Sequence, residues 1–288
     1  SGESIWGSEF LLFILNDFIK ILDQLNNNGK KKEYILQKNK LIENLKKNSW
    51  DGKWYKRAYY DDGSPLGSKD SDECKIDSLS QSWSVFTQFD DASRQIEAME
   101  QVKKNLIDEK NNIVLLFSPP FDKGNKNPGY IKGYPPGVRE NGGQYTHAAI
   151  WVAMAYNKQK NPDYAKRILK MINPINHSST FKKANLYKVE PYVIAADVYN
   201  HPDHKGRGGW SWYTGSASWF FQAGLELLGI EIHKNKIVIN HSTPKEWKKH
   251  SIKFTNKSTI YLINFSREVK NKNNQIILNG TKILNNEV

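Results

Sequence analysis

The sequence predicts a mainly α-helical fold, an incomplete toroid of about four helix pairs followed by a small antiparallel β module. Apolar residues recur at helical spacing through most of residues 1–229. The helical segments are joined alternately by short turns and by long loops, and after Gly229 the pattern changes to alternation of apolar and polar residues. We therefore expect a helical domain over 1–229 and a small β-sheet domain over 230–288.

The first helix is predicted over residues 4–27, where Ile5, Phe10, Ile14 and Phe18 follow helical spacing. Asp77 or Ser78 is expected to cap the third helix, which runs through Trp83 and Phe86. The other helices are expected at about 31–48, 91–109, 143–157, 161–172, a shorter segment ending near Tyr199, and about 215–228.

Long loops are expected over 50–78, 111–140, 173–192 and 200–216, where glycine, proline, asparagine and serine gather. If these loops all lie at one end of the helix pairs, they form a site on a rigid scaffold. Strands and hairpins are expected within 230–240, 251–265 and 274–284, around Asn-Lys and Asn-Gly turns.

The composition excludes several classes of protein. With 38% hydrophobic and 12% aromatic residues, the 288-residue chain has enough apolar material for a sizeable core. Its longest apolar run, Phe10–Leu15, is too short to cross a membrane, and the polar start Ser1-Gly2-Glu3-Ser4 does not resemble a signal peptide. The single cysteine, Cys74, excludes an internal disulfide and favours a reducing, cytoplasmic location.

The net charge of +12 raises the question of a nucleic-acid or membrane partner. The lysines are spread over helix faces, as in "KKKEYILQKNKLIENLKK", and no nucleic-acid-binding motif accompanies them. We therefore interpret the charge as solvated surface and expect no nucleic-acid partner.

Aromatic residues alternate with acids, amides and glycines in the long loops. This composition suits sugars, which offer an apolar face for stacking and hydroxyls for hydrogen bonds. The alternative is that the loop aromatics close the ends of the helical assembly. The set comprises Trp54, Tyr55, Tyr59, Tyr60, Trp210, Trp212, Tyr213 and Trp219.

The segment "YPPGVRENGGQYTHAAIW" (134–151) concentrates polar residues at a helix start: Arg139, Glu140, Gln144, Tyr145 and His147. Glu140 suits sugar hydroxyls or acid–base work. His147, and Thr214-Gly215 at a second helix start, suit a small anion such as phosphate, which helix N-termini favour. Taken singly, each residue also has an ordinary structural explanation, as a core histidine, a capping threonine or a terminal glycine.

Two further groups of residues raise a metal hypothesis. His201 and His204 have a zinc-like spacing, but no partner cysteine or HExxH helix lies near them in sequence. Asp72, Glu73 and Asp77 form an acidic cluster that suits a cation, a sugar, or capping and loop ordering equally. We expect no metal site.

Several motifs in order along the chain resemble glycoside hydrolase family 94, the inverting β-glucoside phosphorylases, and within it the phosphorylase-like region of cyclic β-1,2-glucan synthases. They are "AYYDDGSPLGSKDSDECKIDSLSQSW", "GYPPGVRENGGQYTHAAIW", "NPINH", "VEPYVIAADVY" and "GRGGWSWYTGSASWFFQAGLELLGI". The resemblance implies an (α/α)6 barrel followed by a small β domain, with this chain contributing the C-terminal part of the barrel.

The resemblance also implies roles for individual residues. Phosphate, a co-substrate and not a cofactor, would be bound by His147, Thr214 and Gly215. A β-glucan oligosaccharide would be bound by Glu140, with Arg139 at the acceptor side, and by Gln144, Tyr145 and Trp212. The cellobiose-type enzymes carry a glutamine after "EPYV" where this chain has Ala195 and Ala196, so a β-1,4 preference is not implied.

One departure concerns the general acid. In the family this is the aspartate of an Asp-Trp-Asn-Asp motif upstream of the Gly-Glu-Ser that begins the first helix here, and the motif does not occur in the 288 residues. We therefore expect a C-terminal fragment that binds glucan and phosphate but lacks its acid, with a homodimer as a possible assembly. As part of a glucan synthase it would lie at the cytoplasmic face of the inner membrane. The alternatives are a non-catalytic carbohydrate-binding or regulatory module and an inverting hydrolase.

Overall fold

The computed structural model describes residues 2–233, 236–240, 242–256, 258–267 and 276–283. Within these ranges the chain is mainly helical, with two short 3-10 turns, η1 (Gly129–Gly133) and η2 (Pro202–His204). The helices are α1 (Ile5–Gln24), α2 (Asn28–Asn48), α3 (Ser78–Thr87), α4 (Ala92–Leu106), α5 (Thr146–Lys158), α6 (Pro162–Ile172), α7 (Pro174–His177), α8 (Phe181–Tyr187) and α9 (Ser216–Leu228).

The strands of the helical part are very short and lie among its loops. They form a three-stranded sheet, β1 (Glu3–Ser4), β2 (Ala58–Tyr59) and β3 (Pro65–Leu66), and three antiparallel pairs. The pairs are β4 (Ile76–Asp77) with β7 (Phe117–Ser118), β5 (Ile107–Asp108) with β6 (Ile113–Val114), and β8 (Gln144–Tyr145) with β9 (Asp197–Val198).

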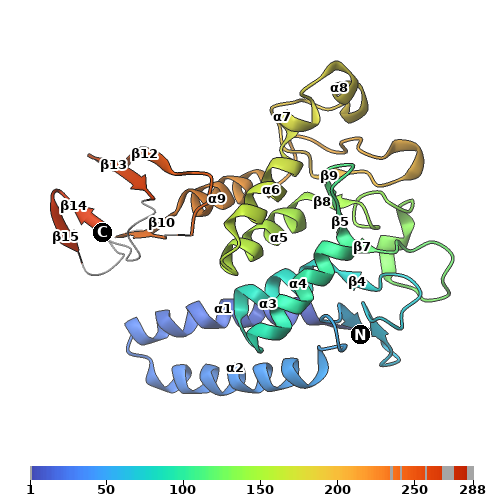
Figure 1. The fold of residues 1–288 in the computed structure, drawn as a ribbon. Coiled ribbons are helices and arrows are strands. Elements are labelled where there is room, and N and C mark those ends of the chain that lie inside the picture. Colours follow the sequence, from blue (N-terminus) through green and yellow to red (C-terminus); the bar gives the residue numbers. More distant parts are fainter. Residues whose placement is uncertain (1, 234–235, 241, 257, 268–275, 284–288) are drawn as a thin grey trace.

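Three antiparallel helix pairs, α1–α2, α3–α4 and α5–α6, make the framework (Figure 1). Within each pair the connection is a short turn, as the sequence predicts. Helices α1, α3, α5 and α9 pack one against the next, with α2, α4 and α6 beside them, and α9 also contacts α6. This order is that of an inner layer of helices with an outer layer around it.

The inner helices begin at the same end of the molecule. Helices α1, α3 and α5 each follow directly after a two-residue strand, β1, β4 and β8 respectively. The long connections 49–77, 107–145 and 188–215 all lie at this end, where Figure 1 shows β4, β7, β8 and β9 together. The long loops therefore meet the condition under which they could form a site on the helical scaffold, and the positive ends of the inner helix dipoles converge there.

Side-chain caps fix where several helices begin. Asp77 accepts hydrogen bonds from the backbone N–H groups of Leu79 (2.7 Å) and Ser80 (3.3 Å), which confirms it as the predicted cap of α3. Ser4 caps α1 by accepting from Gly7 N–H at 3.0 Å. Such caps satisfy backbone donors that have no partner within the helix.

The predicted helix ending near Tyr199 is wrong. Residues 193–200 form no helix, and within them Asp197–Val198 make the strand β9, where Val198 lies opposite Gln144 of β8. The backbone N–H of Thr146 donates to Ala196 O at 2.9 Å, and Ala196 N–H donates to Trp210 O at 2.6 Å. These non-local hydrogen bonds outweigh the helical propensity of the alanine pair. The predicted loop 173–192 instead contains the short helices α7 and α8. Among the described residues, α9 is therefore not preceded by the helix that was expected to pair with it.

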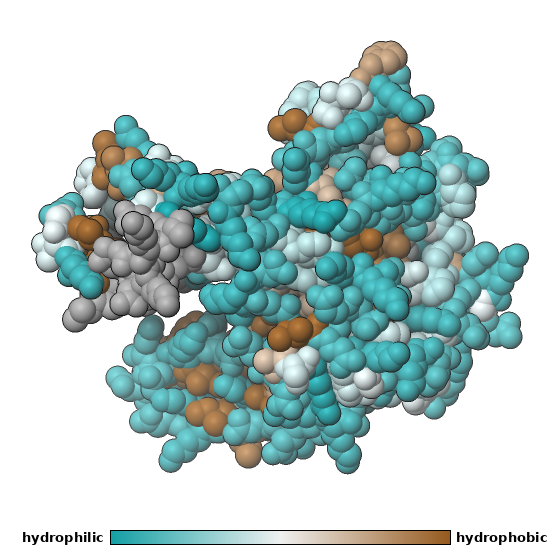
Figure 2. All heavy atoms as spheres, viewed as in Figure 1, coloured by the Kyte–Doolittle hydropathy of each residue, from teal (hydrophilic) through white to brown (hydrophobic). Residues whose placement is uncertain are grey.

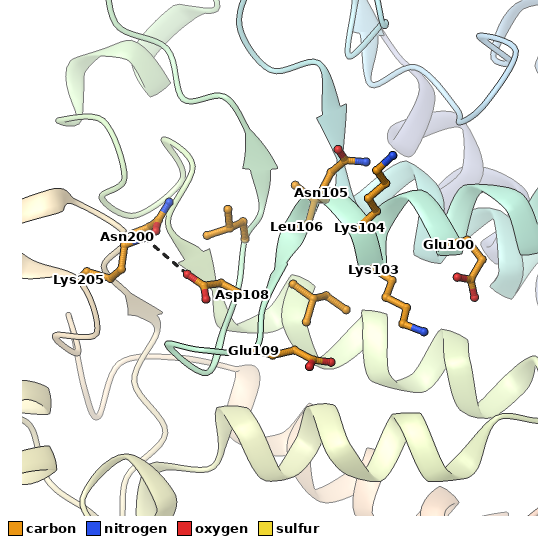
Figure 3. Close-up of a pocket in the computed structure, with 11 residues that line it drawn as sticks. Glu100, Lys103, Lys104, Asn105, Leu106, Asp108, Glu109, Asn200 and Lys205 are labelled. Carbon is orange, nitrogen blue, oxygen red and sulfur yellow. Dashed lines mark ion pairs between the residues drawn. The ribbon is translucent and has the colours of Figure 1, made fainter.

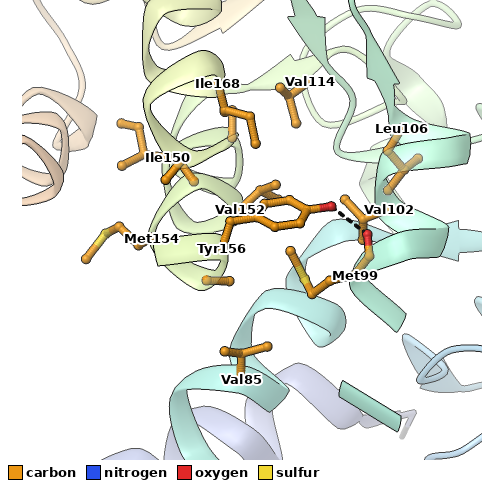
Figure 4. Packing of buried hydrophobic residues seen from close by; sticks show 14 of the residues in the cluster. Val85, Met99, Val102, Leu106, Val114, Ile150, Val152, Met154, Tyr156 and Ile168 are labelled. Carbon is orange, nitrogen blue, oxygen red and sulfur yellow. Dashed lines mark hydrogen bonds between the residues drawn. The ribbon is translucent and has the colours of Figure 1, made fainter. Parts of the chain in front are cut away.

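The main core lies between α3, α4, α5 and α6. Val102, Ala149, Ile150 and Ile168 are fully buried in it. Tyr156 of α5 crosses the same layer and donates its hydroxyl to Met99 O at 2.7 Å (Figure 4). This bond satisfies the only polar atom of a large buried side chain and fixes α5 against α4.

One tryptophan from each inner helix joins an aromatic cluster that links the inner layer. The ring of Trp83 (α3) lies 5.2 Å from that of Trp151 (α5) and 6.2 Å from that of Trp6 (α1). Trp219 (α9) lies 5.6 Å from Trp151. All three contacts are edge-to-face, the arrangement that aromatic quadrupoles favour.

Helix α1 also exposes apolar side chains. Figure 2 shows hydrophobic residues gathered over the α1–α2 region at the lower left. The exposed set on α1 includes Phe10, Leu11, Phe13, Ile14, Phe18, Ile21. No helix in the described ranges is long and apolar enough to span a membrane.

The C-terminal residues form three antiparallel hairpins, as predicted. They are β10 (Ile230–His233) with β11 (Lys236–Ile239), β12 (Lys249–Asn256) with β13 (Thr259–Ser266), and β14 (Ile276–Leu278) with β15 (Thr281–Ile283). Asn279 and Gly280 have φ values of +48° and +85°, those of the expected Asn-Gly turn. The two Asn-Lys turns include residues 234–235 and 257, outside the described ranges. The boundary between domains 1–229 and 230–288 stays a prediction.

Candidate functional site

The centre of the candidate site is the place where the loops before α5 and α9 meet. Tyr145 of β8 lies opposite Asp197 of β9, and this pairing places the turn 137–143 beside the segment 196–200. Gly137 is held at the crossing: its carbonyl accepts from Asn200 N–H at 2.7 Å, and its own N–H donates to Asn141 O at 2.8 Å. A Cβ at Gly137 would come within 2.6 Å of His201 N, so only glycine fits here.

His147 and Gly215 lie against each other, as the phosphate hypothesis requires. A Cβ built on Gly215 would lie 3.2 Å from Nε2 of His147. The backbone of Gly215, directly before α9, therefore faces this ring nitrogen. The imidazole is half-buried between Tyr145, on which it stacks at 5.7 Å, and Trp151 at 5.8 Å. Burial lowers the pKa of His147 below its usual value, which favours the neutral ring.

Thr214 belongs to the same helix start. Its hydroxyl accepts from the backbone N–H of Ser216 at 3.1 Å and also bonds to the Ser216 hydroxyl. Gly215 is the residue before the first turn of α9 and receives no side-chain cap. The structure therefore brings together the backbone at Gly215, the adjoining Thr214 and His147, at two helix N-termini.

Arg139 and Glu140 form an ion pair next to this pair of helix starts. Nε of Arg139 donates to Oε2 of Glu140 at 3.3 Å. The guanidinium lies over two aromatic rings, 4.9 Å from the centre of Trp210 and 5.5 Å from that of Tyr134. Burial opposes its charge, but the nearby carboxylates of Glu140 and Asp197 more than compensate and raise the pKa of Arg139. The cation thus stays charged although most of its side chain is covered.

The other predicted sugar-binding residues, Tyr145, Gln144 and Trp212, differ in how far they are buried and in what they contact. Tyr145 is half-buried and stacks on His147, with its pKa raised by burial and by Glu140. Gln144 is buried and accepts from Val114 N–H at 3.0 Å, so its side chain ties β8 to β6. Trp212 is 71% exposed on the loop before α9, and no described contact joins it to Arg139 or His147.

The acidic cluster in the first long loop has an ordering role. Glu73 accepts from the backbone N–H groups of Asp122 and Gly124, both at 2.8 Å, and holds two loops together. Asp77 caps α3 and pairs with Arg57, which leaves it no free oxygen for a metal. In the part of the chain that the structure describes, no three histidine, cysteine or acidic residues gather as a metal site would require.

Comparison of the sequence with known protein families identifies the family of this chain. The model of the glycosyl hydrolase 94 superfamily, catalytic domain, matches residues 1–229. The chain belongs to this superfamily. That assignment confirms the resemblance seen in the motifs, while the (α/α)6 closure of the helices stays a prediction.

Within the glycosyl hydrolase 94 superfamily the chain is similar to synthases and phosphorylases. It is 41% identical over 281 residues to cyclic β-(1,2)-glucan synthase NdvB of Rhizobium meliloti, covering 97% of this chain and 10% of the relative. It is 28% identical to solabiose phosphorylase of Paenibacillus borealis, covering 95% and 35%, and 25% identical to N,N'-diacetylchitobiose phosphorylase of Vibrio proteolyticus, covering 85% and 31%. The chain therefore spans only a tenth to a third of these relatives.

Three residues of this glycosyl hydrolase 94 chain lie near the predicted ligands but were not assigned to sugar or phosphate from the motifs. They are Asp197, Glu190 and Trp210, the last of which was named only among the loop aromatics. Trp210 stacks on Arg139, and the buried carboxylate of Asp197 lies beneath both. Glu190 accepts from Ser211 Oγ at 2.6 Å and Trp212 Nε1 at 2.9 Å, and these bonds lower its pKa. An acid inside the apolar run "YVIAADVY" was the available signal for Asp197, but the expected helix there concealed its role.

A cavity of about 790 Å³ is lined by other residues (Figure 3). Its wall comes from the C-terminal end of α4, β5 and the loop near Asn200. Lys205 pairs across it with Asp108 at 3.6 Å. None of the residues predicted to bind sugar or phosphate lines this cavity. The cavity therefore does not mark the candidate sugar- and phosphate-binding site.

Proposed function

We propose that this chain is part of a carbohydrate-active enzyme that transfers a glucosyl unit between a β-glucan and phosphate, with inversion. The contact between Nε2 of His147 and the Gly215 backbone carries the proposal, because it joins two helix N-termini beside the Arg139–Glu140 pair. The names of the relatives support the substrate class: one is a β-(1,2)-glucan synthase and two are phosphorylases.

Phosphate binding is proposed at the starts of α5 and α9. The His147 ring would donate one hydrogen bond, and the Thr214 hydroxyl and backbone N–H groups near Gly215 would add others. The converging dipoles of the inner helices favour an anion at this end. Phosphate is already an anion, so no general base is needed, and binding has only to hold its oxygens close to the anomeric carbon.

Sugar binding is proposed beside the phosphate. Glu140 would accept hydrogen bonds from sugar hydroxyls while Arg139 anchors its carboxylate and forms the acceptor side. Tyr145 and Trp212 would offer apolar ring faces to the sugar. Gln144 would support the site indirectly. Its side-chain oxygen accepts a hydrogen bond from Val114 N–H, which holds the strand that carries Tyr145.

We further propose that the general acid is an aspartate outside these 288 residues. The sequence contains no Asp-Trp-Asn-Asp motif, and Glu140 is proposed to hold the donor sugar from its own side. General-acid assistance is worth roughly 10²–10⁴ in rate. The chain alone is then expected to bind glucan and phosphate without turning them over.

The experiment has two parts. Calorimetric titration of the chain with inorganic phosphate and with short β-1,2- and β-1,4-glucans tests binding, and release of glucose 1-phosphate tests turnover. Binding without turnover is the expected result. Robust glucose 1-phosphate release would contradict the assignment of the acid, phosphate-independent release of glucose would show a hydrolase, and absence of any sugar or phosphate binding would overturn the proposed site.

A further inference from the structure

Asp197 lies at the centre of the loop assembly that carries the candidate sugar-binding residues. Its strand is paired on one side with Tyr145 of β8. On the other side, Gly209 N–H donates to Asp197 O at 2.8 Å and Ala196 N–H donates to Trp210 O at 2.6 Å. The residue therefore sits between the turn before α5 and the loop before α9.

The carboxylate of Asp197 is buried, with only 1% of the residue exposed. Oδ1 accepts from Trp210 N–H at 3.3 Å, and the backbone N–H of Arg139 faces the same carboxylate. Oδ2 has no hydrogen-bond partner among the described residues. A buried acid costs free energy unless nearby donors and charges offset its desolvation. Burial raises the pKa of Asp197, and the positive charge of Arg139 opposes that rise only in part.

The backbone around the carboxylate is fitted to it. A Cβ at Gly209 would lie 2.1 Å from Oδ1, so the acid packs directly against the bare Cα of the loop. Arg139 has φ +49°, in the left-handed region that a non-glycine residue seldom adopts. Because its N–H faces Asp197 in this conformation, the carboxylate opposes relaxation of the strained turn.

Arg139 and Trp210, whose backbone N–H groups face the Asp197 carboxylate, also stack on each other through their side chains. The guanidinium of Arg139 lies 4.9 Å from the centre of the Trp210 ring. Arg139 also holds Glu140, the proposed sugar ligand, through its Nε. The buried Asp197 thus contacts the backbones of the two residues, Arg139 and Trp210, whose side chains form a surface together with the Glu140 carboxylate.

We propose that Asp197 is a positioning residue that holds Arg139 and Trp210 together as one sugar-facing wall. It touches neither substrate itself, and it acts on the sugar side and not on the phosphate side of the site. The identification of the ligand as a sugar rests on the proposed function. The positioning of Arg139 and Trp210 by Asp197 does not depend on it. The two can therefore be tested separately.

Two substitutions separate the roles of the carboxylate. Asp197→Asn keeps an acceptor for Trp210 N–H but removes the charge opposite Arg139, and Asp197→Ala removes both. We expect hydrogen exchange of the Arg139 and Trp210 amides to accelerate strongly in Asp197→Ala, with only Arg139 accelerating in Asp197→Asn. Affinity for a short β-1,2-glucan should fall about tenfold in Asp197→Ala, equivalent to about 1.4 kcal/mol, and less in Asp197→Asn. Phosphate affinity should be unchanged in both.

Asp90→Asn is the matched control, because Asp90 is another buried acid beside an arginine, Arg94 at 3.2 Å, away from the site. It should lower stability without changing exchange at Arg139 and Trp210 or the sugar affinity. Unchanged exchange at both amides in Asp197→Ala, or equal losses of sugar and phosphate affinity, would overturn the positioning role. If the wild type binds no glucan while exchange responds as expected, the positioning role holds and the proposed function fails.

Discussion

Nε2 of His147 faces the backbone of Gly215 so closely that a single added methyl group would lie 3.2 Å from it. The two residues are far apart in sequence, at the starts of α5 and α9. Neither could be paired with the other from helical periodicity. Their closeness underlies the anion site that we propose at the shared end of the inner helices, and it can be altered by small substitutions.

Gly215→Ala is the most direct such change. The φ of Gly215 is −75°, which alanine adopts without strain, so we expect the fold to persist. The new methyl group would crowd Nε2 of His147, and loss of one hydrogen bond to a charged ligand, roughly 1.5–3 kcal/mol, predicts phosphate affinity lower by at least tenfold. Calorimetric titration with phosphate measures the change.

Gly224→Ala in the same helix is the control. A Cβ at Gly224 meets nothing within 4 Å. Alanine in a helix interior is favoured over glycine by about 1 kcal/mol, so the variant should be as stable as the wild type or more stable, with normal phosphate affinity. Equal phosphate binding by the two variants would show that the Gly215 position does not face the anion.

The protonation of His147 gives a pH-dependent prediction. Burial lowers its pKa, so the ring is neutral at pH 7 and gains a positive charge only as the pH falls through that lowered value. An anion favours the charged form, and affinity for sulfate, whose charge stays constant over this range, should therefore rise as the pH falls. Histidine NMR resonances should show the pKa of His147 shifted upward by sulfate. A pKa indifferent to sulfate would remove His147 from the anion site.

Glu140→Gln should separate sugar binding from phosphate binding. The amide keeps the shape of the carboxylate but loses its charge, which weakens hydrogen bonds from sugar hydroxyls by roughly 1–2 kcal/mol. Affinity for a short β-1,2-glucan should fall while phosphate affinity is retained. Parallel losses for both ligands would indicate that Glu140, through its pairing with Arg139, organises the loop instead.

Glu9 of α1 predicts an effect on stability. Both of its carboxylate oxygens are buried, and neither has a hydrogen-bond partner in the described ranges. Burial, assisted by the charge of Asp77, raises its pKa well above the usual value. The native state then binds more protons than the unfolded state, so this residue lowers stability as the pH rises from the usual glutamate range toward the raised pKa.

Glu9→Gln should remove this dependence. The midpoint of urea unfolding should rise relative to the wild type at pH 8 and change less at pH 5. Glu43→Gln, at an exposed position of α2, should leave both midpoints unchanged. A destabilised Glu9→Gln protein at pH 8 would mean that the charged carboxylate has a stabilising partner.

Local patterns predicted most of the framework. Apolar spacing and the Asp77 cap were enough to predict α1 to α6 and α9 within a few residues, because apolar residues recur at helical spacing along these segments. Alternation in the C-terminal part was enough for the hairpins. The segment 193–199 was mispredicted because its backbone hydrogen bonds go to Thr146 and Trp210, partners that no local pattern identifies.

The sequence by itself determined the family and the residue types at the two helix starts, since these are carried by contiguous motifs such as those around His147 and Thr214. Tertiary structure alone decided which of these residues contact one another and which are buried. Gln144 turned inward to Val114 N–H, Trp210 and not Trp212 stacked on Arg139, and Asp197 lay buried between them. The physical reason is that a hydrogen bond or a ring contact depends on distance in space, and β8–β9 pairing, not sequence separation, sets those distances here.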